Sequence, residues 1–219
     1  RSLVICLEDA VSEHEVEAAK VNLKHLLQQV QDQPRQAQHP KIFIRPRHIA
    51  MAEELAQWQE LIAVDGMVLP KFCLNQLRQW QQILPDFIQV MPTLEDAETF
   101  DMGAMRELRQ ALQQDFRQVL VLRIGGNDLL NCLAVRRPSD LTLYQTPIGV
   151  LIANLVGQFL PYGFALSAPV CEHFTQVKLL QDELYLDLQH GLSGKTIIHP
   201  AQIAIVHQAY QVNDIELKQ

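Results

Sequence analysis

The chain repeats one pattern that limits the folds open to it: a short apolar run ends in charged or glycine residues, and a helical pattern follows. The clearest case is the run 119–124, which is interrupted by Arg123 and leads through Gly125 and Gly126 to Asp128. Such a run is typical of a buried strand, and glycines at its end let a ligand approach the backbone. We therefore expect Asp128 to face a ligand at the end of this strand.

Strands and helices alternate along the whole chain, which predicts a single α/β domain over residues 1–219. Alternation of this length favours a (β/α)8 TIM barrel over an open doubly wound sheet, because no Gly-x-Gly-x-x-Gly turn opens a helix. A closed barrel has eight strands, so we expect the first strand to be missing before Arg1. The strand-like runs lie at about 3–8, 41–46, 66–72, 87–92, 118–124, 164–170 and 195–199.

Helical patterns separate these runs. Ser12 to Glu15 fits a capping box and predicts a helix at about 12–30, and further helices are expected at about 50–63, 73–83 and 102–114. The uncharged stretch 141–171 contains prolines that divide it, and its unbroken piece 148–160 is too short to span a bilayer. We expect that piece to be a buried helix or a subunit-contact helix, with no role in a membrane.

Composition excludes other classes of protein. A chain of 219 residues, 48% hydrophobic and 20% charged, can bury one large core and has the balance of a soluble globular protein. A formal net charge of −7 argues against a nucleic-acid partner. The four cysteines are widely scattered, without the spacing of a zinc site, which favours reduced thiols and a cytoplasmic location.

Two carboxylates are candidate metal ligands. In a TIM barrel, residues at the carboxyl ends of the strands meet at one mouth. Glu95 and Asp128 follow consecutive strands, and neighbouring strands lie about 4.8 Å apart, so both carboxylates can reach one cation. Carboxylate oxygens suit Mg²⁺, which keeps positions for water and a chelating substrate. Either residue alone is also typical of a helix cap or a solvated loop.

Charged residues at other strand ends are further candidates. Arg45, inside a strand pattern, either grips a substrate carboxylate or forms a structural pair with Glu8 or Asp9. Glu8 and Asp9 have two roles open to them, because one can bond to metal-bound water while the other caps the next helix. Lys71 adds positive charge to the mouth, and a Schiff-base role is the alternative.

Positive charge also gathers near Asp128 in the sequence. Arg123, Arg136 and Arg137 either receive a phosphate or second carboxylate, or balance an acidic chain. The backbone amides of Gly125 and Gly126 can bind a substrate oxygen.

The Gly-Lys-Thr near the C-terminus invites comparison with a phosphate-binding loop. The first glycine of that motif would fall at Gln189, so we reject a nucleotide-hydrolase loop. Gly191 is better explained as a helix stop that leads into the next strand. His199 follows that strand, and a lone histidine there is more often structural than catalytic.

Several runs resemble the citrate lyase beta subunit and malyl-CoA lyase family over nearly the whole chain. The most specific is Gly-x-x-Gly-Lys-x-x-x-His-Pro-x-Gln-Ile, which ends at Ile203, and the next is Val4-Ile-Cys-Leu-Glu-Asp-Ala-Val11. The runs Leu122-Arg-Ile-Gly-Gly-Asn-Asp-Leu-Leu130 and Thr142-Leu-Tyr-Gln-Thr-Pro-Ile-Gly149 are more similar to a divergent branch, the C–C bond lyases associated with tellurite-resistance operons.

The resemblance implies a TIM barrel in which Glu95 and Asp128 hold Mg²⁺ and Arg45 binds a keto-acid carboxylate. It also implies a homo-oligomer, commonly a trimer, in which a C-terminal lid completes a neighbour's site. We expect this lid to be missing from the chain, so the general base is not named.

This chain departs from the family at acidic positions. Cys6 stands where an Asp is usual, Asn127 where a Glu is usual, and the loose match around Glu95 leaves Asp96 and Glu98 as alternative ligands. A less negative mouth beside Arg123 favours a more anionic substrate, such as a phosphorylated one, and makes a coenzyme A thioester less expected.

The resulting hypothesis is a Mg²⁺-dependent carbon–carbon lyase or aldolase that cleaves a small anionic substrate and yields a keto acid. A thioester hydrolase at the same metal site is the first alternative. The second alternative is a catalytically inactive barrel that acts as a binding or assembly subunit.

Overall fold

The computed structural model describes residues 1–33, 35–116 and 118–211, and in them parallel strands alternate with helices. The chain forms two compact units. The first contains Arg1–Thr93 and Gln110–Leu120, and the second contains Leu94–Arg109 and the described residues from Val121 onward. The single-domain organisation over 1–219 stays a prediction, whereas the α/β class predicted from the alternation is confirmed.

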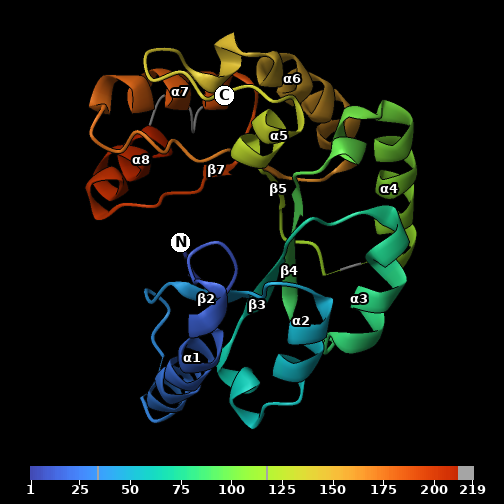
Figure 1. Cartoon of the computed structure of the whole chain (residues 1–219), viewed down its shortest axis with the longest axis vertical. Coiled ribbons are helices and arrows are strands. Elements are labelled where there is room, and N and C mark those ends of the chain that lie inside the picture. The colour runs from blue at the N-terminus through green and yellow to red at the C-terminus, as the bar shows by residue number, and fades with distance from the viewer. Residues whose placement is uncertain (34, 117, 212–219) are drawn as a thin grey trace. The chain divides into compact units, whose positions relative to one another are not determined.

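The first unit is built on parallel strands that follow their order in the sequence. Its strands are β1 (Ser2–Cys6), β2 (Lys41–Arg45), β3 (Gly66–Leu69) and β4 (Gln89–Leu94), the last residue of which belongs to the second unit. Between them run the helices α1 (Val16–Gln31), α2 (Ile49–Ala56) and α3 (Leu77–Ile83) (Figure 1). The register pairs Cys6 with Arg45, so the ends of β1 and β2 lie side by side.

The second unit repeats this arrangement with shorter strands. β5 (Leu122–Ile124), β6 (Leu166–Ala168) and β7 (Gly194–Lys195) pair in parallel. Its helices are α5 (Gly126–Cys132), α6 (Pro147–Phe159), α7 (Val177–Gln189), α8 (Ile203–Ala209) and the first turns of α4 (Met102–Asp115) (Figure 1). The described strands begin and end close to the predicted runs but are mostly shorter.

Short 3-10 turns precede or follow several helices. The predicted helix 50–63 is in fact α2 followed by a separate 3-10 turn, and the predicted helix 73–83 begins with another. These turns are η1 (Glu13–Glu15), η2 (Gln59–Ala63), η3 (Leu74–Gln76), η4 (Ala97–Phe100), η5 (Leu143–Gln145), η6 (Leu160–Tyr162) and η7 (Pro200–Gln202).

The predicted capping box at the first helix is wrong in its bonding. Ser12 is the N-cap of η1, but its side chain makes no capping bond to the backbone. Instead the Ser12 hydroxyl donates to the carboxylate of Glu15. A 3-10 turn consequently opens this segment, and α1 begins only at Val16. A capping box does form at η5, where Thr142 and Gln145 bond reciprocally.

The apolar segment predicted as a buried helix is α6. Its residues Ile148, Ile152 and Leu155 are fully buried, which confirms the core position, while Val150 remains 68% exposed. Within the described part of the chain, no helix has the length and apolar character needed to cross a membrane.

The predicted helix stop at Gly191 is confirmed. Gly191, which follows the C-cap residue His190 of α7, has a φ of +72°, and its amide donates to the carbonyl of Leu188. The amide of Leu192 then reaches back to the carbonyl of Asp187 at 3.0 Å. This pair of bonds ends a helix through a left-handed residue, which glycine adopts without strain.

The four cysteines are free thiols in different surroundings, which gives a direct test of the packing. Cys171 is fully buried against Leu180 and Leu184, and burial, helped by the carboxylate of Glu183, raises the pKa of its thiol. Cys132 is exposed. Because the thiolate is the reactive form, we expect iodoacetamide at pH 8 to label Cys132 in the native protein and Cys171 only after unfolding, as read by peptide mass spectrometry. Equal labelling rates in the native protein would contradict this packing.

Candidate active site

The ends of β1 and β2 bring together three predicted site residues of the first unit. Glu8 is 5% exposed, and its Oε2 lies 2.5 Å from Nη2 of Arg45. The carboxylate of Asp9, which is largely exposed, lies 3.7 Å from Nη1 of the same arginine. The sequence predicted two roles for Arg45, binding of a substrate carboxylate or a structural ion pair with Glu8 or Asp9, and this is the predicted ion pair. A buried carboxylate of this kind is retained only when a cation balances it.

Neither acid caps the following helical segment. Ser12 occupies the N-cap position, and Asp9 instead extends the charge around Arg45. Arg47 closes the same loop from the other side, because its guanidinium donates to the carbonyls of Glu8 and Val11 and pairs with Glu13 at 3.2 Å.

Lys71, two residues after the end of β3, has an unusual backbone conformation. Its φ is +46°, in the left-handed region that a side chain with a Cβ rarely adopts. The residue is exposed. A Schiff-base lysine needs a desolvated amine, so the exposure of Lys71 supports the electrostatic option over the covalent one.

In the second unit, Gly125 lies directly against Glu95. The amide of Gly125 donates to the carbonyl of Leu94 at 3.0 Å, which joins the ends of β4 and β5. A Cβ atom on Gly125 would lie 2.4 Å from Cβ of Glu95 and 2.6 Å from its Oε2. Glu95 itself is 3% exposed. The glycine is therefore required because a buried carboxylate occupies the space that a side chain would need.

Asp128 follows one helical turn later. It lies in the first turn of α5, and the helix begins from Gly125, whose carbonyl accepts from Leu129 at 3.0 Å. The Asp128 carboxylate is half-buried and makes no hydrogen bond or ion pair to any described residue. Gly125 is the N-cap of α5 and Asp128 is its third residue, so Asp128 lies at the same end of the helix as the contact between Gly125 and Glu95. Of the alternative ligands, Asp96 is half-buried and Glu98 is exposed.

The second glycine serves packing. A Cβ on Gly126 would lie 2.7 Å from the side chain of Leu143 and 2.8 Å from that of Pro169. Leu143 begins η5 and Pro169 follows β6, so Gly126 lets α5 pack closely against both. Substrate binding by the Gly125 and Gly126 amides stays a prediction.

The arginines predicted near Asp128 have separate surroundings. Arg123 on β5 reaches across the sheet and donates to Oγ1 of Thr196 at 2.9 Å. Arg137 is buried in an ionic network, whereas Arg136 is exposed beside it. His199 is structural, as expected, because its Nδ1 accepts from the amide of Ala201 and its ring stacks on Phe174.

Sequence reasoning missed a buried ionic network in the second unit. Nζ of Lys195 on β7 lies 3.1 Å from Glu183 and 3.0 Å from Asp187, and all three side chains are at most 1% exposed. Glu183 also accepts from Arg137 at 2.7 Å. Burial raises the pKa of the Asp187 carboxyl above its usual value. Lys195 and the Tyr144 hydroxyl, which donates to Asp187 at 2.6 Å, offset only part of this rise.

A signal for this network was present in the sequence. Glu183 and Asp187 lie on α7 at positions that share a helical face with Leu180 and Leu184, which are buried. Acidic residues in the apolar stripe of a helix need cations from another element. The Lys195 of the Gly-Lys-Thr run supplies one of them.

Parallel strands alternating with helices, with carboxylates and an arginine at the carboxyl ends of the strands, are the arrangement found in enzymes of the barrel class. The family described as "C-C_Bond_Lyase of the TIM-Barrel fold" matches residues 1–219. The chain therefore belongs to this family of C–C bond lyases, which confirms the predicted fold and the predicted resemblance.

Solved structures support the same fold. RipC from Yersinia pestis superposes with a TM-score of 0.75 at 19% identity, covering 98% of this chain and 90% of RipC. CitE from Mycobacterium tuberculosis, in complex with magnesium and acetate, gives 0.72 at 22% identity, covering 99% and 84%. The citrate lyase beta subunit of M. tuberculosis with oxaloacetate and magnesium gives 0.72 at 20% identity, covering 96% and 87%. No protein with a curated description matches the chain.

The contact between Gly125 and Glu95 can be tested by adding one methyl group. In Gly125→Ala the new Cβ meets the Cβ of Glu95, which is fixed to the backbone and cannot turn aside, so we expect a loss of about 1–3 kcal/mol in unfolding free energy. Gly157→Ala on α6 is the matched control, because its Cβ meets nothing within 4 Å and should gain about 0.5–1 kcal/mol. Urea denaturation measures both, and an unchanged midpoint for Gly125→Ala would refute the contact.

The buried network can be tested at Lys195. Lys195→Met leaves Glu183 and Asp187 with less positive charge in the core, and we expect a loss of about 3–5 kcal/mol in unfolding free energy. Lys178→Met removes an exposed ion pair with Asp182 on α7, the helix that also carries Glu183 and Asp187, and should change the unfolding free energy little. Similar midpoints for the two variants in chemical denaturation would rule out a stabilising role for the network.

Proposed function

We propose that the chain is a Mg²⁺-dependent carbon–carbon lyase of the aldolase type, which cleaves a small anionic substrate and releases a keto acid. The observation that carries this proposal is the Asp128 carboxylate. It has no partner among the described residues and lies one helical turn from Gly125, which touches the buried Glu95. A carboxylate kept near a second, buried carboxylate has a ready use as a cation ligand.

The donor set fits Mg²⁺. Glu95 and Asp128 offer oxygen atoms only, and the partial exposure of Asp128 leaves room for water and substrate at the ion. When bound, Mg²⁺ would supply Lewis-acid stabilisation of the negative charge that develops on the keto-acid oxygen. The magnesium in the M. tuberculosis citrate lyase beta structure with oxaloacetate supports this assignment.

Arg45 is the proposed anchor for the substrate carboxylate. Its guanidinium has five N–H donors in a planar fork, and Glu8 holds it in one orientation from the protein side. The exposed Asp9 lies further away, at 3.7 Å, and is the partner that an incoming carboxylate would replace more easily. Glu8 is thus proposed to position Arg45, and Asp9 to tune its charge.

Other residues would fix the rest of the substrate. Of the two glycine amides predicted to donate to a substrate oxygen, that of Gly125 already donates to the carbonyl of Leu94, so we assign this role to the amide of Gly126, at the first position of α5. Lys71 and Arg123 are proposed to add positive potential for an anionic substrate, which a phosphorylated compound or a coenzyme A thioester would both satisfy. A homo-oligomer, such as a trimer, and a cytoplasmic location stay predictions.

The engagement of Arg45 by Glu8 and Asp9 is the observation that favours the second candidate, a barrel that binds a partner or ligand without catalysis. The two candidates differ in their need for the metal. A thioester hydrolase at the same metal site differs in product, because it would release only a free acid and a thiol.

The proposed metal site is tested with Asp128→Asn, which keeps the shape of the side chain and removes its charge. We expect Mg²⁺ binding by calorimetry in the presence of oxalate to weaken at least tenfold, and the release of keto acid from candidate substrates to fall with it. Asp182→Asn, an exposed change on α7, should leave both unchanged. Equal Mg²⁺ affinity in the parent and Asp128→Asn would exclude the lyase at this site and leave the binding subunit.

A further inference from the structure

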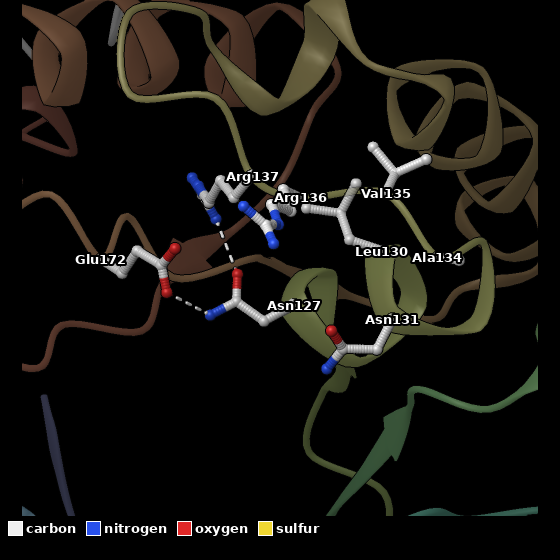
Figure 2. Close-up of a pocket in the computed structure, with 8 residues that line it drawn as sticks. All are labelled: Asn127, Leu130, Asn131, Ala134, Val135, Arg136, Arg137 and Glu172. Atoms are coloured by element: carbon white, nitrogen blue, oxygen red, sulfur yellow. Dashed lines mark hydrogen bonds between the residues drawn. The ribbon is translucent and has the colours of Figure 1, made fainter.

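Helix α5 carries a polar pocket beside Asp128, which does not itself line it. The pocket has a volume of about 540 Å³ (Figure 2). Asn127 and Asn131 lie four residues apart and therefore on one side of the helix. Polar groups and a short apolar wall form its lining: Asn127, Leu130, Asn131, Ala134, Val135, Arg136, Arg137 and Glu172.

The turn after α5 brings two arginines back to this face. The amides of Ala134 and Val135 donate to the carbonyls of Asn131 and Leu130, both at 3.0 Å, which ends the helix through a left-handed residue. That residue is Ala134, with a φ of +53°, at a position that glycine usually fills. A side chain with a Cβ is strained in this conformation, and strained residues concentrate at ligand sites.

Arg137 forms the fixed wall of the pocket. Its Nη1 donates to Oδ1 of Asn127 at 3.1 Å and to the carbonyl of Val170 at 2.8 Å, and its Nη2 donates to Glu183 at 2.7 Å. The side chain is only 4% exposed. Its charge is already balanced by Glu183, so Arg137 shapes the pocket and orients the amide of Asn127.

Arg136 differs from its neighbour in every respect. It is exposed, and it makes no hydrogen bond or ion pair with any described residue. Like Arg137, it lines the pocket (Figure 2). An exposed guanidinium without a protein partner at the edge of a pocket can pair with an anion that enters the pocket.

The opposite wall offers acceptors. Oε2 of Glu172 accepts from Nδ2 of Asn127 at 2.7 Å, which leaves Oε1 without a partner in the described part of the chain. Glu172 does not pair with Arg136. The side-chain amide of Asn131 is exposed on the same helix face. A ligand here would meet a cation at one point and a carboxylate and an amide nearby.

We propose that this pocket is an oxyanion subsite in which Arg136 binds a phosphate or carboxylate of the substrate. A hydroxyl group next to that anion would donate a hydrogen bond to Glu172 and would bond to the side-chain amide of Asn131. Glu172 repels a bare anion, so a neighbouring O–H donor is part of the recognition. The proposed function enters this inference at one point only, where the bound anion is taken to be part of the lyase substrate.

Its place on α5 limits the size of that substrate. Asn127 and Asp128 are adjacent on the helix and point about 100° apart. A substrate with its keto-acid end at Asp128 and its second anion at Arg136 would cross part of one side of this helix, whose diameter with side chains is about 10–12 Å. This corresponds to a short hydroxylated chain with an anion at each end.

The subsite is tested by calorimetry with two probes in the presence of EDTA, so that the metal site does not contribute. Glycerol 3-phosphate and glycerate both carry hydroxyl groups beside an anion and differ in whether it is a phosphate or a carboxylate. We expect at least one to bind, with the tighter probe identifying the anion. Arg136→Gln should weaken that binding at least tenfold, and Asn131→Asp, which adds a negative charge to an exposed position, should weaken it as well.

Matched variants separate this inference from the proposed lyase. Arg106→Gln removes another exposed arginine of the second unit that does not line the pocket, and it should bind the probe as the parent does. Asp128→Asn should also retain probe binding even if Mg²⁺ binding is lost. Failure of both probes to bind the parent at tens of millimolar, or equal binding by Arg136→Gln, would overturn the subsite whatever the outcome at the metal.

Discussion

The second unit depends on how Glu183 is neutralised in its interior. This carboxylate is 1% exposed and receives Arg137, Lys195 and the amide of Leu143. Taking a carboxylate out of water costs several kcal/mol, so the fold is stable only if all three donors arrive together. They come from the loop after α5, from β7 and from η5. A single buried charge therefore fixes the relative positions of segments that are far apart in the sequence.

The buried Glu183 also helps to hold the candidate metal ligand Asp128 in place, through Arg137 and Asn127. Arg137 connects Glu183 to Asn127, and Asn127 is followed directly by Asp128. On its other side α5 is held by Gly126, which packs against Leu143 and Pro169. The first turn of α5 is thus fixed by charge on one side and by close packing on the other, which suits a ligand that must be held in one orientation.

Much of this could be predicted from the sequence, for reasons that particular residues make clear. The strand that ends at Ile124 is an apolar run closed by Gly125, and Gly191 ends a helix. The hydrophobic pattern and the positions of the glycines were therefore enough to predict both elements. The pairing of Arg45 with Glu8 was open as one of two alternatives, because β1 and β2 were expected to be neighbours. The capping box at Ser12 did not form: the Ser12 hydroxyl donates to the carboxylate of Glu15, and its oxygen accepts from no backbone amide of the turn.

What could not be predicted depends on contacts between distant segments. Nothing local in the sequence distinguishes Arg136 from Arg137, yet one is buried against Glu183 and the other is exposed. The difference arises from the turn at Ala134, a left-handed residue that sequence patterns assign to glycine. The need for Gly125 was visible, but its cause, the Glu95 side chain, required the neighbouring strand end.

The immobility of Arg137 has a consequence for how the pocket on α5 would discriminate among ligands. Arg137 makes three hydrogen bonds within the protein, so its side chain loses little rotamer freedom when the pocket fills. The entropy loss falls mainly on the exposed side chains of Arg136 and Asn131. Selectivity would then come from a pre-organised shape and not from adaptation of the rim. Molecules that differ by the position of one hydroxyl group should be told apart without any rearrangement of the backbone.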